Sequence, residues 1–167
     1  HYTVKRQTKA QRIVNKNTII CSRSEDQEKY LKDVDKQLDI MIFCLNIDNS
    51  TLEKEALRKI NYFICDYLEY SLDDLSGDLL QALETKRGTC AVYSSLFQLL
   101  CQRCGIECYF IHDLEHNHAY NRVHLSNGEI YYFDVTWNDT TTLMKTTFSF
   151  CDLKTFQENH RWDSITP

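Results

Sequence analysis

The chain has 167 residues, of which 43% are apolar and 26% charged, with four glycines and one proline. This composition suits one globular domain with its own core and excludes collagen-like, low-complexity and linker-rich proteins. No apolar run approaches the 18 or more residues of a membrane-spanning helix, so no membrane span is expected.

Charge divides the chain into a basic start and an acidic remainder. Residues 1–24 carry six Lys and Arg and no acidic residue, which leaves 13 basic against 24 acidic residues for the rest. A basic arm could bind nucleic acid or lipid, but docking on its own acidic domain, or a link to an upstream segment, is favoured. We therefore predict a basic N-terminal arm or linker over 1–24, a single domain over 25–167 and no nucleic-acid partner. The oligomeric state stays undetermined.

Three helices are predicted in the first half of the domain. Apolar residues at helical spacing indicate a long helix over 25–46. Ser50 and Glu53 form the capping-box pattern S-x-x-E, which predicts the start of a second helix whose apolar stripe extends to Tyr67. A short helix is expected over about 76–86.

The second half is predicted to contain one buried helix followed by strands. The helix opening at Cys90 is apolar around most of its circumference, which is typical of a central helix, and Gly105 suits its end. The apolar period then changes to two, and strands are predicted at IECYFIH, HAYNRVHL and EIYYFDVTW, with TTFSF as a possible fourth and a last helix over about 152–159. Helices followed by antiparallel strands indicate an α+β fold.

Cys90 has the surroundings of an activated thiol. At a helix N-terminus, the free backbone N–H groups and the helix dipole stabilise a thiolate, and Lys86 and Arg87 act in the same direction. The same N–H groups could stabilise an oxyanion. A cysteine nucleophile also needs a base, and His118 and Asp134 lie on two strands that a hairpin would pair. Taken singly, each of these residues is more often structural.

The length of the hairpin loop decides whether His118 and Asp134 can meet. Side chains alternate faces along a strand. A two-residue loop, 127–128, would put the two side chains on opposite faces. A three-residue loop, 126–128, with Gly128 at positive φ would make them diagonal neighbours on one face. We predict the odd-length loop, a His118–Asp134 hydrogen bond, and contact of that face with the start of the Cys90 helix.

Four motifs in order carry a family resemblance. G-x-C at a helix start, GIEC, HAYN and FDVTWND, over about residues 60–140, resemble the transglutaminase-like superfamily, a branch of the papain-like cysteine-peptidase fold, in its bacterial form. The resemblance implies Cys90 as nucleophile, His118 as general base and acid, and Asp134 as orienting carboxylate. It also implies N-terminal helices and a nucleophile-bearing central helix packed on a C-terminal antiparallel sheet.

Four residues are candidates for the substrate cleft. Tyr70 matches the tyrosine-bearing segment that precedes the cysteine in this family, and His116 lies in the loop before the histidine motif. Tyr120 stands where the family usually has Trp, which puts substrate preference in doubt. Trp137 is expected to pack under the site rather than to bind substrate.

The implied function is cysteine-dependent acyl transfer on peptide or glutamine-type amides through a thioester. Hydrolysis, as a protease or amidase, is the first choice because it needs no second substrate site. The alternatives are a protein-crosslinking transglutaminase and a non-catalytic module that binds peptides or proteins. A protein or peptide substrate is expected, and no cofactor.

The eight cysteines are interpreted as free thiols. Cys44, Cys65 and Cys101 lie inside apolar helical patterns, where cysteines are usually small buried hydrophobes. This favours a reducing, cytoplasmic compartment, although a secreted or cell-surface location stays open because a leader could have preceded His1.

Two metal sites are considered and disfavoured. Three cysteines and a histidine could form a zinc set, but they lie on a helix end and an outgoing strand, and Cys108 belongs to the GIEC motif: Cys101, Cys104, Cys108 and His112. The stretch HDLEHNH is taken as a polar loop, and no metal is expected.

Overall fold

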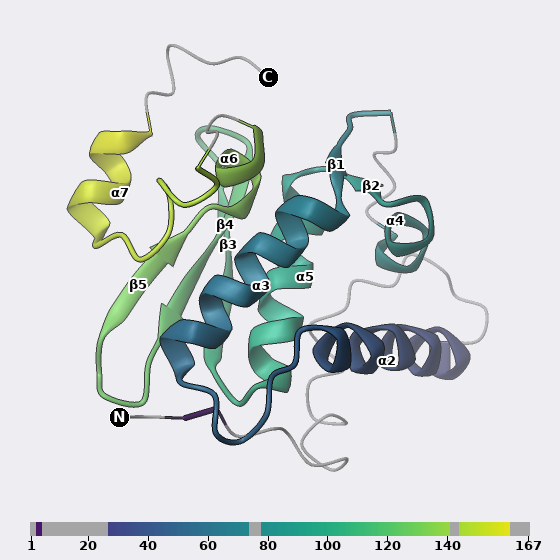
Figure 1. The fold of residues 1–167 in the computed structure, drawn as a ribbon. Coiled ribbons are helices and arrows are strands. Elements are labelled where there is room, and N and C mark those ends of the chain that lie inside the picture. The colour runs from purple at the N-terminus through teal and green to yellow at the C-terminus, as the bar shows by residue number, and fades with distance from the viewer. Residues whose placement is uncertain (1–2, 5–26, 74–77, 141–143, 161–167) are drawn as a thin grey trace.

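A computed structural model describes residues 3–4, 27–73, 78–140 and 144–160 (Figure 1). Its centre is helix α5 (Cys90–Arg103), which contacts α3 (Glu53–Tyr67) and a three-stranded antiparallel sheet. Figure 1 shows α3 in front of α5, with the sheet on one side and α2 and α4 on the other. The predicted α+β class, with a central helix packed on a late antiparallel sheet, is confirmed.

Helices α2 (Gln27–Cys44) and α4 (Leu79–Thr85) pack against each other and against α5. The described parts of the predicted helices agree with these bounds, while residues 25, 26, 76 and 77 lie outside the described residues. Arg103, buried at the end of α5, makes ion pairs with Asp35 and Asp39 of α2. Charge pairing therefore ties α2 to α5 where the apolar core ends.

The core is built around α5 because that helix is apolar on nearly every side. Tyr93, Leu96, Phe97 and Leu100 are fully buried, and Phe97 packs on Phe133 of the sheet with ring centroids 5.0 Å apart. A rigid central helix fixes the direction of its first residue, Cys90. Gly105 follows the helix at a φ of 72°, as expected for a helix stop.

The sheet has the order β3–β4–β5, made of β3 (Glu107–Asp113), β4 (His118–His124) and β5 (Ile130–Phe133). The expected fourth strand at TTFSF does not form. Those residues make turns, and the chain meets β5 in a single bridge, between Tyr132 and Cys151. The sheet is completed on that side by a loop leading to α7 (Leu153–Asn159).

The hairpin between β4 and β5 has the predicted three-residue loop. Asn121 pairs with Phe133 and His124 with Ile130, and the Leu125 N–H donates to the Glu129 carbonyl to close a loop over residues 126–128. Gly128 has a φ of 89°, a conformation that glycine adopts without a steric penalty. The register that places His118 and Asp134 diagonally is therefore confirmed.

The predicted capping box at α3 is wrong. Leu52 is the N-cap, with no side-chain cap, and Ser50 hydrogen-bonds to Asp48 instead. The buried Glu53 carboxylate accepts hydrogen bonds from the backbone N–H and the hydroxyl of Ser126, at 3.2 and 2.7 Å. The Glu53 side chain therefore binds the β4–β5 hairpin loop instead of capping α3.

Two short parallel strands place the segment before α5. β1 (Glu69–Tyr70) pairs with β2 (Arg87–Gly88), so that Tyr70 lies beside Gly88. On the other side of the site, β5 is followed at once by α6 (Val135–Thr140). Both arrangements bring chain segments to the N-terminal end of α5.

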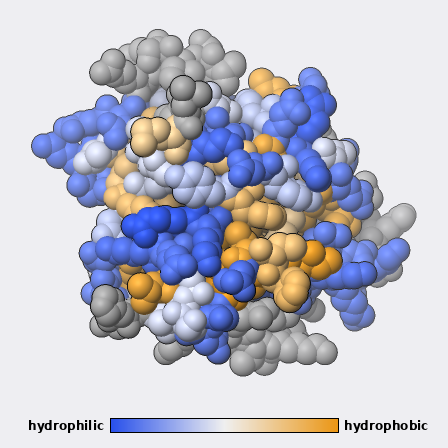
Figure 2. All heavy atoms as spheres, viewed as in Figure 1, coloured by the Kyte–Doolittle hydropathy of each residue, from blue (hydrophilic) through white to orange (hydrophobic). Residues whose placement is uncertain are grey.

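The surface seen in Figure 2 is mostly hydrophilic, with a smaller apolar area near its middle. The large exposed apolar side chains of α2 are Ile40 and Phe43.

Of the basic arm, residues 3 and 4 are described: Val4 is buried, and its N–H donates to the Thr51 carbonyl. The rest of the arm lies outside the described residues. Among the described helices, none is long and apolar enough to cross a membrane.

Candidate active site

Cys90 is the first residue of α5, as predicted, and is partly exposed. The first turn of a helix leaves backbone N–H groups free, which favours negative charge at this position. Burial alone would raise the pKa of the Cys90 thiol, but its interaction with His118 and the backbone N–H of Ala119 outweigh burial and lower the pKa below the ordinary value. The thiol therefore has the character of a nucleophile.

Gly88 lets the chain pass close to the first turn of α5. A Cβ at this position would lie 2.6 Å from the Cβ of Val92, which is fixed to the helix backbone and cannot move away. We expect Gly88→Ala to lower the free energy of unfolding by about 1–3 kcal/mol and to slow alkylation of Cys90, measured by urea unfolding and intact mass.

The matched control for this substitution is Gly105→Ala, at the opposite end of α5. Gly105 has a positive φ, so alanine is expected to cost about 1 kcal/mol through backbone strain alone. Cys90 alkylation should then stay at the wild-type rate. Equal slowing in both variants would mean that the close approach of Gly88 has no particular effect on the thiol.

His118 begins β4 and is buried beside the thiol. Its Nε2 lies 2.6 Å from Oδ2 of Asp134, which confirms the predicted hydrogen bond. Burial alone would lower the pKa of His118, but hydrogen bonds with Asp134 and Cys90 outweigh it and raise the pKa to about 10. These two partners therefore favour the protonated form of the imidazole.

Asp134 is fully buried and accepts hydrogen bonds on both oxygens. Oδ1 takes the backbone N–H of Trp137 at 3.0 Å, and Oδ2 faces His118 and, at 2.9 Å, Nε2 of His160. Burial alone would raise the pKa of Asp134, but the two histidines lower it below its ordinary value. The carboxylate was expected inside the strand. It lies instead just after β5, at the start of α6.

His160 was given no role from the sequence, because HRW matches no motif and is remote from the other site residues. It follows α7, its side chain is fully buried, and its Nδ1 lies 2.7 Å from the Phe156 carbonyl oxygen. The feature that the sequence does show is a histidine in a C-terminal segment rich in aromatic residues. That feature does not indicate which side chain the imidazole contacts.

The body of α5 packs on the face of the sheet opposite His118 and Asp134, while His118 makes the predicted contact with the start of α5 at Cys90. Asn121, on the opposite face of β4, donates to the Ser94 carbonyl of α5. Tyr120, on the same face as His118, packs on Phe156 of α7 with ring centroids 4.7 Å apart. Helix α7 therefore covers the face with the histidine, and the imidazole reaches Cys90 from the end of β4.

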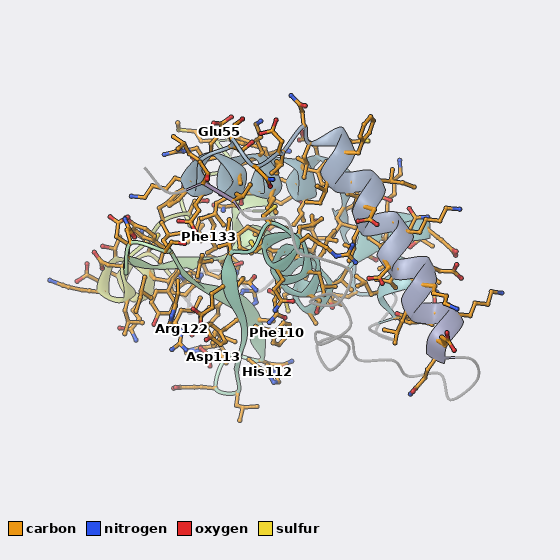
Figure 3. All side chains as sticks on the ribbon, turned by 90° about the horizontal axis from the view of Figure 1, so that it is seen from below. Glu55, Phe110, His112, Asp113, Arg122 and Phe133 are labelled. Atoms are coloured by element: carbon orange, nitrogen blue, oxygen red, sulfur yellow. The ribbon has the colours of Figure 1, made fainter. Side chains whose placement is uncertain are left out.

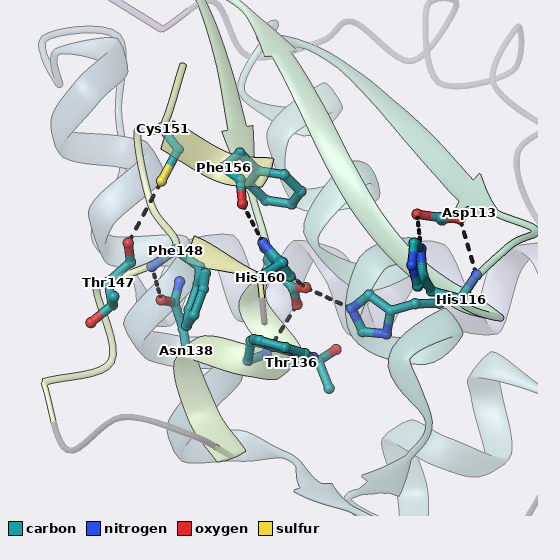
Figure 4. Close-up of polar contacts among 12 residues, drawn as sticks. Asp113, His116, Thr136, Asn138, Thr147, Phe148, Cys151, Phe156 and His160 are labelled. Carbon is teal, nitrogen blue, oxygen red and sulfur yellow. Dashed lines mark hydrogen bonds and ion pairs between the residues drawn. The ribbon is translucent and has the colours of Figure 1, made fainter. Parts of the chain in front are cut away.

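The four cleft candidates differ in their surroundings. Tyr70 pairs with Gly88, two residues before Cys90, and burial, followed by the charges of Cys90 and Asp134, raises its pKa. Tyr120 packs under α7, as described above. His116 lies in the turn between β3 and β4, with its Nδ1 2.9 Å from Oδ2 of Asp113 (Figure 4), the residue that pairs with His118 across the two strands.

Trp137 is buried, as expected for a residue that packs under the site. Its ring centroid lies 4.5 Å from that of His160 and 6.2 Å from that of His118. Substrate contacts of Trp137, and of the other three residues, stay predictions.

The described cysteines are free thiols, but they differ in exposure. Cys65 and Cys101 are buried as predicted, whereas Cys44 is exposed because it ends α2 on the side away from the core. Burial raises the pKa of Cys65 to about 12. Buried thiols of this kind are poor nucleophiles at neutral pH.

Three of the four considered zinc ligands lie together, since Cys101 interacts with Cys104 and Cys108, but His112 does not join them. Cys101, Cys104 and Cys108 are buried, while His112 is exposed near the end of β3 (Figure 3). Within the described ranges, no group of three or more His, Cys, Asp or Glu side chains is arranged to hold a metal ion.

Comparison with known proteins gives one family and one curated relative. The family model of the transglutaminase-like superfamily matches residues 44–139. A mouse (Mus musculus) protein named kyphoscoliosis peptidase is 26% identical over 148 residues, in a match that covers 68% of this chain and 22% of the mouse protein. The chain thus corresponds to less than a quarter of that relative. The bacterial assignment suggested by the motifs stays a prediction.

Proposed function

Because the chain belongs to the transglutaminase-like superfamily, whose members include cysteine peptidases and acyltransferases, we propose that it is a cysteine-dependent enzyme that hydrolyses peptide amides through a thioester. The observation that carries the proposal is the arrangement of the Cys90 thiol beside His118, whose Nε2 is held 2.6 Å from the buried Asp134. The name of the mouse relative, a peptidase, supports hydrolysis over the alternatives.

In the first half of the proposed reaction, the Cys90 thiolate attacks the carbonyl carbon of the amide. Backbone N–H groups at the start of α5 stabilise the oxyanion of the tetrahedral intermediate. The His118 imidazolium gives its proton to the amide nitrogen, the C–N bond breaks, and the amine leaves. The acyl group stays on sulfur as a thioester.

In the second half, neutral His118 takes a proton from a water molecule, whose oxygen attacks the thioester carbonyl. The C–S bond breaks, the carboxylic acid product leaves, and the thiolate–imidazolium pair is restored. Asp134 holds the imidazole in position and stabilises its charged form throughout. An amine in place of water would give crosslinking, and the triad alone does not select between the two acceptors.

The test uses the 167-residue chain and a peptidyl vinyl sulfone, an electrophile that traps an activated thiolate. We expect one adduct by intact mass, located at Cys90, and no adduct in Cys90→Ala. The exposed Cys44 serves as the internal reference thiol. An adduct at Cys44 with Cys90 unmodified would contradict the proposal.

A second measurement distinguishes the acceptors. Peptides from a denatured-protein digest are incubated with the chain in the presence of a biotinylated primary amine. New peptide termini without biotin are expected. Biotin incorporation would instead indicate crosslinking activity, and neither product, with Cys90 alkylated at the rate of Cys44, would indicate a binding module.

A further inference from the structure

Both ring nitrogens of His160 face oxygen atoms that accept hydrogen bonds (Figure 4). The Phe156 carbonyl oxygen, 2.7 Å from Nδ1, has no proton to donate. The ionised Asp134 carboxylate, 2.9 Å from Nε2, also only accepts. A hydrogen bond at each nitrogen needs a proton there, so the two contacts are satisfied together only by a ring that donates from both nitrogens.

The surroundings of His160 suit a buried cation. Its ring lies among three aromatic rings, with centroid distances of 4.5 Å to Trp137, 4.7 Å to Phe148 and 4.1 Å to Phe156. Aromatic faces attract cations, most strongly where water is excluded. The side chain is fully buried, so the charge also needs an anion in direct contact, and Asp134 is that anion.

The ionisable groups around His160 form a short chain. Asp134 contacts it from the start of α6, and His118 faces it from β4 with ring centroids 6.5 Å apart. Lys154 and Glu158 of α7 are exposed and pair with each other. Beyond His118 lies Cys90, so the buried order is Cys90, His118, Asp134, His160.

We propose that His160 is a positioning residue of the site: it holds Oδ2 of Asp134 on the side away from His118 and keeps the buried group neutral when Cys90 is a thiolate. This inference rests on the proposed function. The charges then alternate along the chain of four groups, from the thiolate through the His118 imidazolium and the Asp134 carboxylate to the His160 imidazolium.

The charge of His160 affects how readily the Cys90 thiolate takes up a proton, because it changes the net charge of the four groups. With His160 present, a proton added to the thiolate leaves the buried group with a net positive charge. Without it, the same proton neutralises a net negative charge, which a low-dielectric interior favours. Loss of His160 also removes one of the donors that fix Asp134. Both effects make Cys90 easier to protonate as the pH falls.

The test measures alkylation of Cys90 by iodoacetamide from about pH 4 to about pH 8 in the wild type and in two variants. His160→Leu removes the donor and the charge, and we expect the acid limb of the profile to move up by about one pH unit, a roughly tenfold slower reaction on that limb. His160→Gln keeps an N–H donor without the charge, and should give a smaller shift in the same direction.

The matched control is His124→Gln, at a partly exposed histidine at the other end of β4 whose ring lies 5.1 Å from that of Tyr109. Its profile should coincide with that of the wild type. If both His160 variants fold and their profiles also coincide with the wild type, His160 is structural and the inference is wrong. An unreactive Cys90 in the wild type would refute the proposed function and, with it, this role.

A spectroscopic measurement tests the charge directly and does not depend on reactivity. In a long-range ¹H–¹⁵N correlation spectrum of the wild type at about pH 8, where an unperturbed imidazole is neutral, both ring nitrogens of His160 should have the shifts of protonated nitrogens. One protonated and one unprotonated nitrogen would overturn the inference even if the variants change the alkylation profile.

Discussion

Asp134→Asn is expected to reduce peptide hydrolysis by roughly 10³–10⁴-fold, the loss typical of a triad whose orienting carboxylate becomes an amide. The buried carboxylate is the shared acceptor of His118 and His160. An asparagine has one acceptor oxygen, and its amino group only donates. It therefore cannot accept a hydrogen bond from an N–H group of the histidine that it faces. The imidazole of His118 then loses both its orientation and the negative charge that keeps it protonated.

The same substitution should lower stability, because it leaves two buried imidazoles without their anion. Breaking a buried charge pair on one side costs about 3–5 kcal/mol, which urea unfolding would detect. Asp66→Asn is the control, since Asp66 pairs with Lys145 at the exposed end of α3. If Asp134→Asn hydrolyses peptides at the rate of Asp66→Asn, Asp134 does not orient the histidine.

His118→Gln is expected to slow alkylation of Cys90 at about pH 6 by roughly 10²-fold. In the wild type, the interaction with His118 is the main influence that lowers the pKa of the thiol against the opposing effect of burial. Without it, Cys90 becomes a partly buried thiol with a pKa at or above the usual value of about 8.5, and only a small fraction is thiolate at that pH. Hydrolysis should be lost as well.

The exposed Cys44 provides the reference within each molecule. Its alkylation should be equal in the wild type and in His118→Gln, which excludes a general change in reagent or solvent access. Equal slowing of both thiols would point to a change in conditions rather than to the histidine. Unchanged reactivity of Cys90 would mean that the helix N-terminus, and not His118, activates the thiol.

His118 also makes stability depend on pH in a direction that can be checked. Its pKa is raised to about 10 in the folded state, above the value of about 6.5 expected when unfolded. The stabilisation is therefore complete below about pH 6.5 and is lost as the pH rises through about 10. The free energy of unfolding should differ most between wild type and His118→Gln below pH 6.5, and least above pH 10.

Local chemistry in the sequence was sufficient for the parts of the site that depend on near neighbours. The apolar circumference of the segment after Cys90 determined a buried central helix, because such a surface is stable only when covered on all sides. Gly128 determined the odd-length loop, since its positive φ suits glycine best. Strand alternation then brought His118 and Asp134 to one face, so this hydrogen bond could be predicted by counting residues.

Contacts between distant segments were decided by the tertiary structure alone. Glu53 binds Ser126, 73 residues away, rather than capping its own helix. A buried carboxylate without a hydrogen-bond donor costs more free energy than an exposed one, because water cannot replace the donor. His160 meets Asp134 because α7 covers the sheet face that carries His118 and Asp134. Neither contact can be predicted from the spacing of residues along the chain. Each depends on which surfaces remain uncovered after the helices and strands have packed.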